Sequence, residues 1–282
     1  LVLASIFFYG SWNPIYLISL FLSMGINFSI GRILSRNDQW RRRSILVFGI
    51  SANLASLAYF KYANFFVENV NAGIGTHWNI GDIVLPLAIS FYTFTQIAYL
   101  VDAWRGKAKE YSFLHYCLFV TFFPHLIAGP LMHHQEIIPQ FEKLRRRDEL
   151  WPDFAVGLTI IVIGMFKKVV LADSLAQYVD PLFDAAANGE AINTIDSWVA
   201  TIGFSLQIYF DFSGYTDMAI GSARLFGIRL PENFRSPYKA SSIIEFWRRW
   251  HMTLSRFLRD YLYFSLGGNR HGSARRYRNL FI

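Results

Sequence analysis

Runs of about twenty apolar residues recur along the chain, and each is long enough to cross the hydrocarbon core of a bilayer as a helix. They lie at residues 15–34, 45–67, 83–104, 154–172 and 198–226. Hydrophobic residues make up 53% of the 282 residues and charged residues only 17%, whereas about one quarter of the residues in a soluble domain are charged. The sequence therefore predicts an all-α, polytopic integral membrane protein.

Both ends of the chain fall in apolar sequence. Residues 1–9 form an apolar run that follows neither a Met nor a charged segment, and residues 278–282 begin another run. A signal peptide would instead carry a positively charged segment before its apolar part. We therefore expect residues 1–282 to be a single membrane domain that is truncated at both ends.

Basic residues gather in alternate loops, and this predicts an orientation. Lys and Arg cluster at residues 35–44 and 105–110, whereas residues 68–82 and 173–197 contain none. Basic loops stay on the cytoplasmic side, so the two loops without Lys or Arg are expected outside. The apolar segment 112–129 has basic sequence on both sides. We expect it to be a re-entrant hairpin that lines a cavity, where irregular backbone is tolerated at membrane depth.

Charged residues also occur inside the apolar runs; they are Lys167, Lys168, Asp211 and Asp217. The two lysines either mark a functional site within the membrane or reach the interface from a helix that ends early. The two aspartates flank Ser213 and Gly214, residue types that favour turns. We expect a helix end or hairpin there, which would break the run 198–226, with ion coupling as the functional alternative.

The stretch 224–278 is strongly basic. It carries twelve Lys and Arg against three acidic residues, or +9, in a chain whose net charge is +7. A cytoplasmic surface beside anionic lipid accounts for most of these charges. A phosphate-bearing ligand, such as the nucleotide end of an acyl-CoA, accounts for a few of them. Aromatic residues are interleaved too densely for a solvated arm, so we expect no nucleic-acid partner.

The block Glu245-Phe-Trp-Arg-Arg-Trp-His-Met-Thr-Leu-Ser255 holds the candidate catalytic residue. Read as one helix, it pairs Glu245 with Arg249 and places Trp247, His251 and Ser255 on another face. Apolar neighbours lower the pKa of a histidine and keep the ring neutral, as a general base must be. A purely structural histidine is the alternative.

Other chemical motifs are missing from the sequence. There is no Gly-x-Ser-x-Gly, no P-loop and no His-Glu-x-x-His. The single cysteine, Cys117, excludes a disulfide within the chain and a cysteine-based metal site. His133 and His134 are adjacent, so they cannot face one metal from the same side of a helix. We expect neither a metal nor a bound cofactor.

Several sequence blocks, in this order, resemble the membrane-bound O-acyltransferase family, and within it the bacterial alginate O-acetylation branch. The blocks are Tyr59-Phe-Lys-Tyr-Ala-Asn64, Leu85-Pro-Leu-Ala-Ile-Ser-Phe-Tyr92, Phe123-Pro-His-Leu-Ile-Ala-Gly-Pro130, Tyr209-Phe-Asp-Phe-Ser-Gly-Tyr-Thr-Asp-Met-Ala-Ile-Gly221, Glu232-Asn-Phe234, Glu245–Ser255, Leu258-Arg-Asp-Tyr-Leu-Tyr263 and Gly267-Gly-Asn-Arg270. The resemblance implies a ring of transmembrane and re-entrant helices around a thinned centre, with a tunnel through it.

The resemblance also implies an active site with two polar residues. His251 would be the second of them, since other branches carry Asn or Asp at the matching place. The main catalytic histidine of the family would lie beyond residue 282, so we expect the chain to be an incomplete enzyme. Residues near His251 are expected to bind substrate: Asn233, Arg248, Arg249, Trp250 and Ser255.

The implied activity is acyl transfer, most simply of an acetyl group. A cytoplasmic acyl-CoA would donate it to a hydroxyl on an extracytoplasmic partner protein or an envelope polysaccharide such as alginate. The protein would be a multi-pass protein of the bacterial inner membrane. Two alternatives from other classes are a transporter, for which we find no matching pair of interrupted segments, and a non-catalytic membrane scaffold.

Overall fold

The computed structural model describes residues 1–35, 42–81, 83–108, 112–127, 129–142, 147–270 and 272–281. These residues form helices joined by turns and loops, with no strand among them, which confirms the all-α class. Contacts divide the chain into two compact units, Leu1–Ile127 with Leu131–Glu142, and Ala128–Pro130 with Lys143–Ile282. We describe each unit separately. The single domain, the ring of helices and the orientation stay predictions.

Seven helices are described in the first unit: α1 (Val2–Trp12), α2 (Ile15–Ser35), α3 (Arg42–Ile74), α4 (Ile89–Trp104), α5 (Phe113–Thr121), α6 (Phe123–Leu126) and α7 (His134–Glu142). The second unit contains α8 (Arg147–Met165), the π-helix η1 (Phe166–Ala172), α9 (Asp173–Ala187), α10 (Thr194–Leu225), the 3₁₀-helix η2 (Pro237–Lys239), α11 (Ile243–Arg249), α12 (Met252–Phe257), the π-helix η3 (Leu258–Tyr263) and α13 (Ser273–Phe281).

Three helices within the described residues are long and apolar enough to cross a membrane: α2, α3 and the continuous helix Leu150–Ala187. They match the predicted runs 15–34, 45–67 and 154–172. The third continues through α9, so residues 173–187 are helical rather than part of a loop. That they lie outside stays a prediction. Helix α3 likewise begins at Arg42 and extends to Ile74, into both flanking loops. Residues 36–41 and 143–146, with the basic residues Arg36, Arg41, Lys143, Arg145 and Arg146, lie outside the described residues.

In the predicted run 83–104, the helix begins several residues after the start of the apolar sequence. Helix α4 starts at Ile89, because Pro86 and a left-handed Ala88 (φ 56°) precede it. Only 16 residues remain helical.

The segment 112–129 is not a continuous spanning helix. Helix α5 is capped by Ser112, whose side chain accepts from the backbone N–H of His115. It ends after 9 residues, and the 4-residue α6 follows the break at Phe122. At about 1.5 Å per residue neither piece can cross the hydrocarbon core. That both ends of the segment face the same side stays a prediction.

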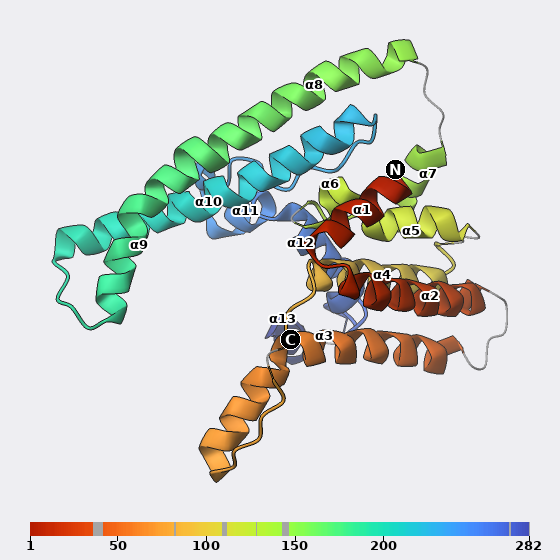
Figure 1. The fold of residues 1–282 in the computed structure, drawn as a ribbon, viewed down its shortest axis with the longest axis horizontal. Helices are drawn as coiled ribbons and strands as arrows, with labels where there is room; N and C mark the ends of the chain where they lie inside the picture. The colour runs from red at the N-terminus through yellow and green to blue at the C-terminus, as the bar shows by residue number, and fades with distance from the viewer. Residues whose placement is uncertain are drawn as a thin grey trace. The chain divides into compact units, whose positions relative to one another are not determined.

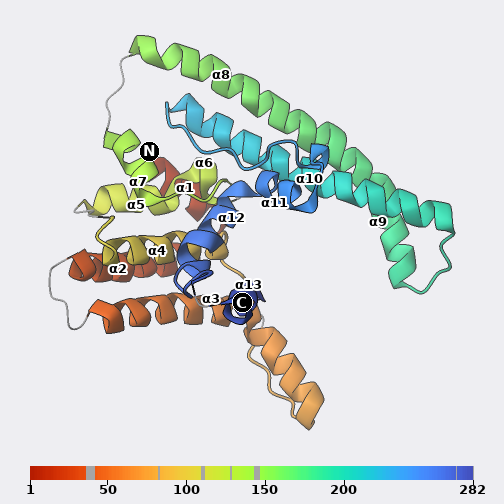
Figure 2. The ribbon, with the colours of Figure 1, turned by 180° about the vertical axis from the view of Figure 1, so that it is seen from behind.

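Helix α10 runs unbroken from Thr194 to Leu225, so the hairpin predicted at Ser213-Gly214 was wrong. Glycine serves a different purpose there. A Cβ on Gly214 would lie 2.8 Å from the backbone oxygen of Gly164, and one on Gly164 would lie 2.7 Å from that of Gly214. The pair Gly157 and Gly221 makes the same approach, seven residues away on each helix. Helices α8 and α10 therefore pack backbone to backbone (Figures 1 and 2), as small residues allow in membranes.

This close packing brings opposite charges together. Lys167 Nζ lies 2.5 Å from Asp217 Oδ2, and Lys168 Nζ lies 2.5 Å from Asp173 Oδ1 and 2.7 Å from Asp211 Oδ1. Both lysines lie in η1, where the wider π-helical turn interrupts the usual spacing of side chains. Charges within a membrane are normally paired in this way. Each lysine thus has an ion-pair partner in the second unit, and a functional role of these charges stays a prediction.

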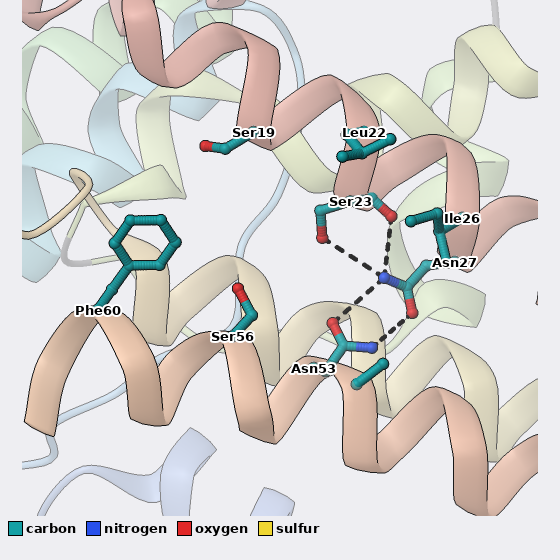
Figure 3. Close-up of a pocket in the computed structure, with 9 residues that line it drawn as sticks. Ser19, Leu22, Ser23, Ile26, Asn27, Asn53, Ser56 and Phe60 are labelled. Carbon is teal, nitrogen blue, oxygen red and sulfur yellow. Dashed lines mark hydrogen bonds between the residues drawn. The ribbon is translucent and has the colours of Figure 1, made fainter. Parts of the chain in front are cut away.

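A pocket of about 240 Å³ lies between α2 and α3 in the first unit (Figure 3). In it, Asn53 Nδ2 donates to Asn27 Oδ1 at 2.7 Å, and Asn27 Nδ2 donates to Asn53 Oδ1 at 3.2 Å. The same Nδ2 atoms donate to the backbone oxygens of Ser23 and Gly49 on their own helices. Reciprocal amide bonds of this kind hold membrane helices together.

Replacing Asn53 with Leu should lower the stability of the purified protein by about 1–3 kcal/mol, because the Asn27 amide stays buried without its partner. The double variant Asn27→Leu/Asn53→Leu should cost less than the single one, since no polar group is left unpaired. Unfolding in detergent measures both. A double variant that is less stable than either single variant would contradict this account of the pair.

Candidate active site

The block 245–255 forms two helices rather than the single helix we predicted. Helix α11 ends at Arg249 and α12 begins at Met252, with His251 between them in the left-handed conformation (φ 44°, ψ 52°). The prediction that His251 shares a face with Trp247 and Ser255 was therefore wrong, although those two residues line one cavity. Left-handed backbone is uncommon for a residue other than glycine and often marks a functional site.

The predicted pairing of Glu245 with Arg249 is confirmed. Arg249 Nη2 lies 2.5 Å from Glu245 Oε1. Glu245 Oε2 accepts from both the backbone N–H and the hydroxyl of Ser241 at 2.8 Å, and Ser242 caps α11 by accepting from the Glu245 N–H. These bonds lower the pKa of the Glu245 carboxyl, with the Ser241 N–H as the largest cause. Arg249 thus stabilises the start of α11 through Glu245.

The break at His251 is held by the Glu232-Asn-Phe234 block. His251 Nδ1 lies 2.9 Å from Asn233 Oδ1, which also accepts from the Thr253 hydroxyl at 2.9 Å and from its N–H at 3.3 Å. The backbone oxygen of Asn233 accepts from the Met252 N–H at 2.9 Å. Next to it, the Arg235 N–H donates to the backbone oxygen of Arg249 at 3.0 Å. Residues 233–235 therefore fix the turn on which His251 stands.

Aromatic rings enclose the imidazole. Phe212, from α10, meets it edge to face with ring centroids 4.8 Å apart, and Phe234 stacks on it at 6.3 Å. Trp250 packs edge to face on Phe234 at 5.1 Å and stacks on Phe246 at 5.6 Å. Burial lowers the pKa of the His251 imidazole from 6.5 to about 4. The ring is therefore neutral near pH 7, as a general base must be.

The predicted site residues do not all meet at His251. Asn233 and Trp250 lie beside it, as described above. Arg248 is exposed, and Ser255 lines a different cavity of about 700 Å³ with Trp247 and Arg259. The substrate roles predicted for these residues stay predictions.

A smaller cavity opens beside the turn, and sequence reasoning missed its residues. It has a volume of about 400 Å³ and is lined by Pro231, Glu232, Arg235, Met252, Thr253 and Arg256. Phe212 was also missed, although it belongs to a block that we quoted. The sequence blocks that contain Phe212 and His251 were recognised, but the contacts between the blocks join residues far apart in the sequence.

Comparison with known proteins adds the family. The protein-family model described as MBOAT, membrane-bound O-acyltransferase family, matches residues 103–282, which include every residue of the His251 turn. Over the whole of this chain, peptidoglycan O-acetyltransferase of Helicobacter pylori is 44% identical and probable alginate O-acetylase AlgI of Pseudomonas aeruginosa 42% identical; the matches cover 58% and 54% of those proteins. Teichoic acid D-alanyltransferase of Bacillus subtilis is 32% identical over 64% of this chain and 46% of its own length.

The chain thus spans about half the length of the curated relatives it matches. The match of the family model nevertheless covers more than half of this chain, and it takes in both the α8–α10 pair and the histidine turn. On that match, together with its membrane-spanning helices, the chain belongs to the membrane-bound O-acyltransferase family.

Proposed function

We propose that the full-length protein is an O-acetyltransferase that transfers an acetyl group from cytoplasmic acetyl-CoA to a hydroxyl group of an extracytoplasmic polysaccharide. The observation that carries the proposal is the His251 imidazole, which is held by Asn233 and enclosed by aromatic rings at a half-buried break between helices in a membrane protein. Relatives named as O-acetyltransferase and O-acetylase, at 44% and 42% identity, support acetyl as the group transferred. The alternation of basic loops supports a multi-pass protein of the inner membrane.

In this reaction the acceptor hydroxyl oxygen attacks the acetyl carbonyl carbon. A C–O ester bond forms, the C–S bond of the thioester breaks, and the hydroxyl proton is passed to the leaving CoA thiolate, which becomes the free thiol. Such a step needs a base and a donor to the carbonyl oxygen. We assign the base to another histidine of the full-length protein. His251 then orients the acceptor or hydrogen-bonds the group that reacts.

The acceptor is proposed as an exopolysaccharide or wall polymer of the envelope, such as alginate. The names of the relatives cover alginate, peptidoglycan and teichoic acid, so the polymer has to be identified by experiment. Deleting the gene in its source bacterium should abolish alkali-labile acetate on one purified envelope polymer, and the wild-type gene should restore it. Unchanged acetate on every envelope polymer would contradict the proposal.

Arg248 is the residue that we expect to bind the phosphates of acetyl-CoA. It is exposed in the basic stretch, whereas Arg249 forms an ion pair with Glu245. Arg248→Glu should weaken acetyl-CoA binding about tenfold at low salt, equivalent to about 1.4 kcal/mol, and less at high salt because ions screen the phosphates. Arg275→Glu, on α13, makes the same charge change in the same stretch and is the matched control. Equal effects of both variants would leave only a general influence of net charge.

A further inference from the structure

We propose that Asn233 is a positioning residue, which selects the tautomer of His251 and so leaves the Nε2 lone pair free for the reaction. The expected effect of Asn233 on catalysis rests on the proposed acetyl transfer. The assignment of the His251 tautomer rests on the hydrogen bonds alone. The side chain of Asn233 is only 1% exposed, and it therefore does not present a surface to a substrate. This differs from the substrate-binding role that we predicted for it.

The orientation of the Asn233 amide follows from its neighbour. The backbone N–H of Thr253 can only donate, and it points at the amide atom that lies 2.9 Å from His251 Nδ1. If the amide were turned over, its NH₂ group would face that N–H, two donors would meet, and the bond from the Thr253 N–H would be lost. The atom facing Thr253 and His251 is therefore the carbonyl oxygen.

A carbonyl oxygen accepts only, so His251 Nδ1 must carry the proton. In a neutral imidazole the other nitrogen, Nε2, then holds the lone pair. No described residue makes a hydrogen bond to Nε2. Among the described residues, Asn233 meets the ring through a hydrogen bond and Phe212 and Phe234 meet it through ring contacts, and none of the three is charged. The structure thus offers one acceptor atom at the turn, in a fixed direction.

Two further observations indicate that the Asn233 position serves His251. Its backbone oxygen holds the Met252 N–H, so the same residue anchors the left-handed turn and the ring on it. Its Nδ2 is buried without a hydrogen-bond partner among the described residues. An asparagine used only to satisfy buried polar groups would use both ends of its amide. Here only the oxygen is used.

Two substitutions in the full-length protein test this role in acetyl transfer. Asn233→Leu should lower kcat on the order of 10²-fold, the low end of what a positioned acid–base group contributes, with little change in KM for acetyl-CoA. Asn233→Asp keeps the acceptor but adds a negative charge, which favours the imidazolium form. Its activity should therefore recover towards high pH and begin to fall at a higher pH than the wild-type activity does as the pH drops. Asn69→Leu and Asn69→Asp, at an exposed site on α3, are matched controls.

The tautomer of His251 can be determined without any assay of activity. Ring-¹⁵N-labelled histidine in the full-length protein, with the signal of His251 assigned by its loss in His251→Asn, should show protonated Nδ1 and unprotonated Nε2 at pH 7. Protonated Nε2 would overturn the proposal. So would Asn233→Leu and Asn233→Asp proteins that keep the wild-type kcat and pH profile per folded molecule. The expected tautomer in a wild-type protein without acetyl transfer would instead refute the proposed function and leave the positioning role standing.

Discussion

Replacing His251 with Ala in the full-length protein should slow acetyl transfer by about 10²–10³-fold, or about 2.7–4 kcal/mol, the usual effect of losing one preorganised hydrogen bond at a reacting group. The expectation follows from a neutral ring that is enclosed by Phe212 and Phe234 and held through Nδ1. His251→Asn should keep part of the activity, because an amide can hydrogen-bond and orient but cannot act as a base near neutral pH.

The backbone at His251 calls for its own control. Its φ of 44° suits Gly and Asn, whereas the left-handed conformation costs most other residues about 1–2 kcal/mol. His251→Gly relieves this strain without restoring a side chain, so it should be as inactive as Ala while folding better. A wild-type rate in His251→Ala would mean that the residue is structural. An Asn variant as inactive as Ala, in folded protein, would make proton transfer by His251 the better account.

The second large effect is expected where α8 and α10 touch. Gly214→Ala should destabilise the protein by about 1–3 kcal/mol, as overpacking does, because the new methyl group meets backbone atoms of Gly164 and Lys168. Gly214→Leu should prevent accumulation of folded protein. Backbone atoms cannot move aside as the end of a flexible side chain can, so the helices would have to separate. The ion pairs of Lys167 with Asp217 and of Lys168 with Asp211 would then be lost.

Gly25→Ala and Gly73→Ala provide the matched comparison. Both glycines are helical, and a Cβ on either meets nothing within 4 Å. The same substitution should stabilise the protein there by about 0.5–1 kcal/mol, because glycine weakens a helix interior relative to alanine. Unfolding of the purified variants in detergent checks both signs. Equal stability of the Gly214→Ala and Gly25→Ala variants would show that α8 and α10 are not in close contact.

The sequence predicted the helical membrane class and three of its spans because hydropathy is a local property. It could not predict that α10 continues through Ser213-Gly214, since the same glycine suits a turn or a close helix contact. Only the partner glycine, Gly164, fifty residues earlier in the chain, distinguishes the two uses. For the same reason the lysines and aspartates were recognised separately but not as ion pairs.

The candidate site shows the same limit. The histidine was found from its block, but the break at His251 was missed, because Trp250 and Met252 carry no local stop signal. What bends the chain there is a set of bonds to Asn233, 18 residues earlier. Such bonds between distant residues cannot be read from local propensity, which favoured one continuous helix.

The central claim is that the full-length protein transfers acetyl groups rather than moving a solute. The direct measurement uses wild-type protein in sealed vesicles, with acetyl-labelled acetyl-CoA on the side that carries Arg248 and an oligosaccharide of the envelope polymer on the other. The account predicts labelled acetate esters on the oligosaccharide and one free CoA thiol for each ester, with both lost in His251→Ala. Movement of an unmodified solute across the vesicle membrane, with no ester formed by folded wild-type protein, would contradict it.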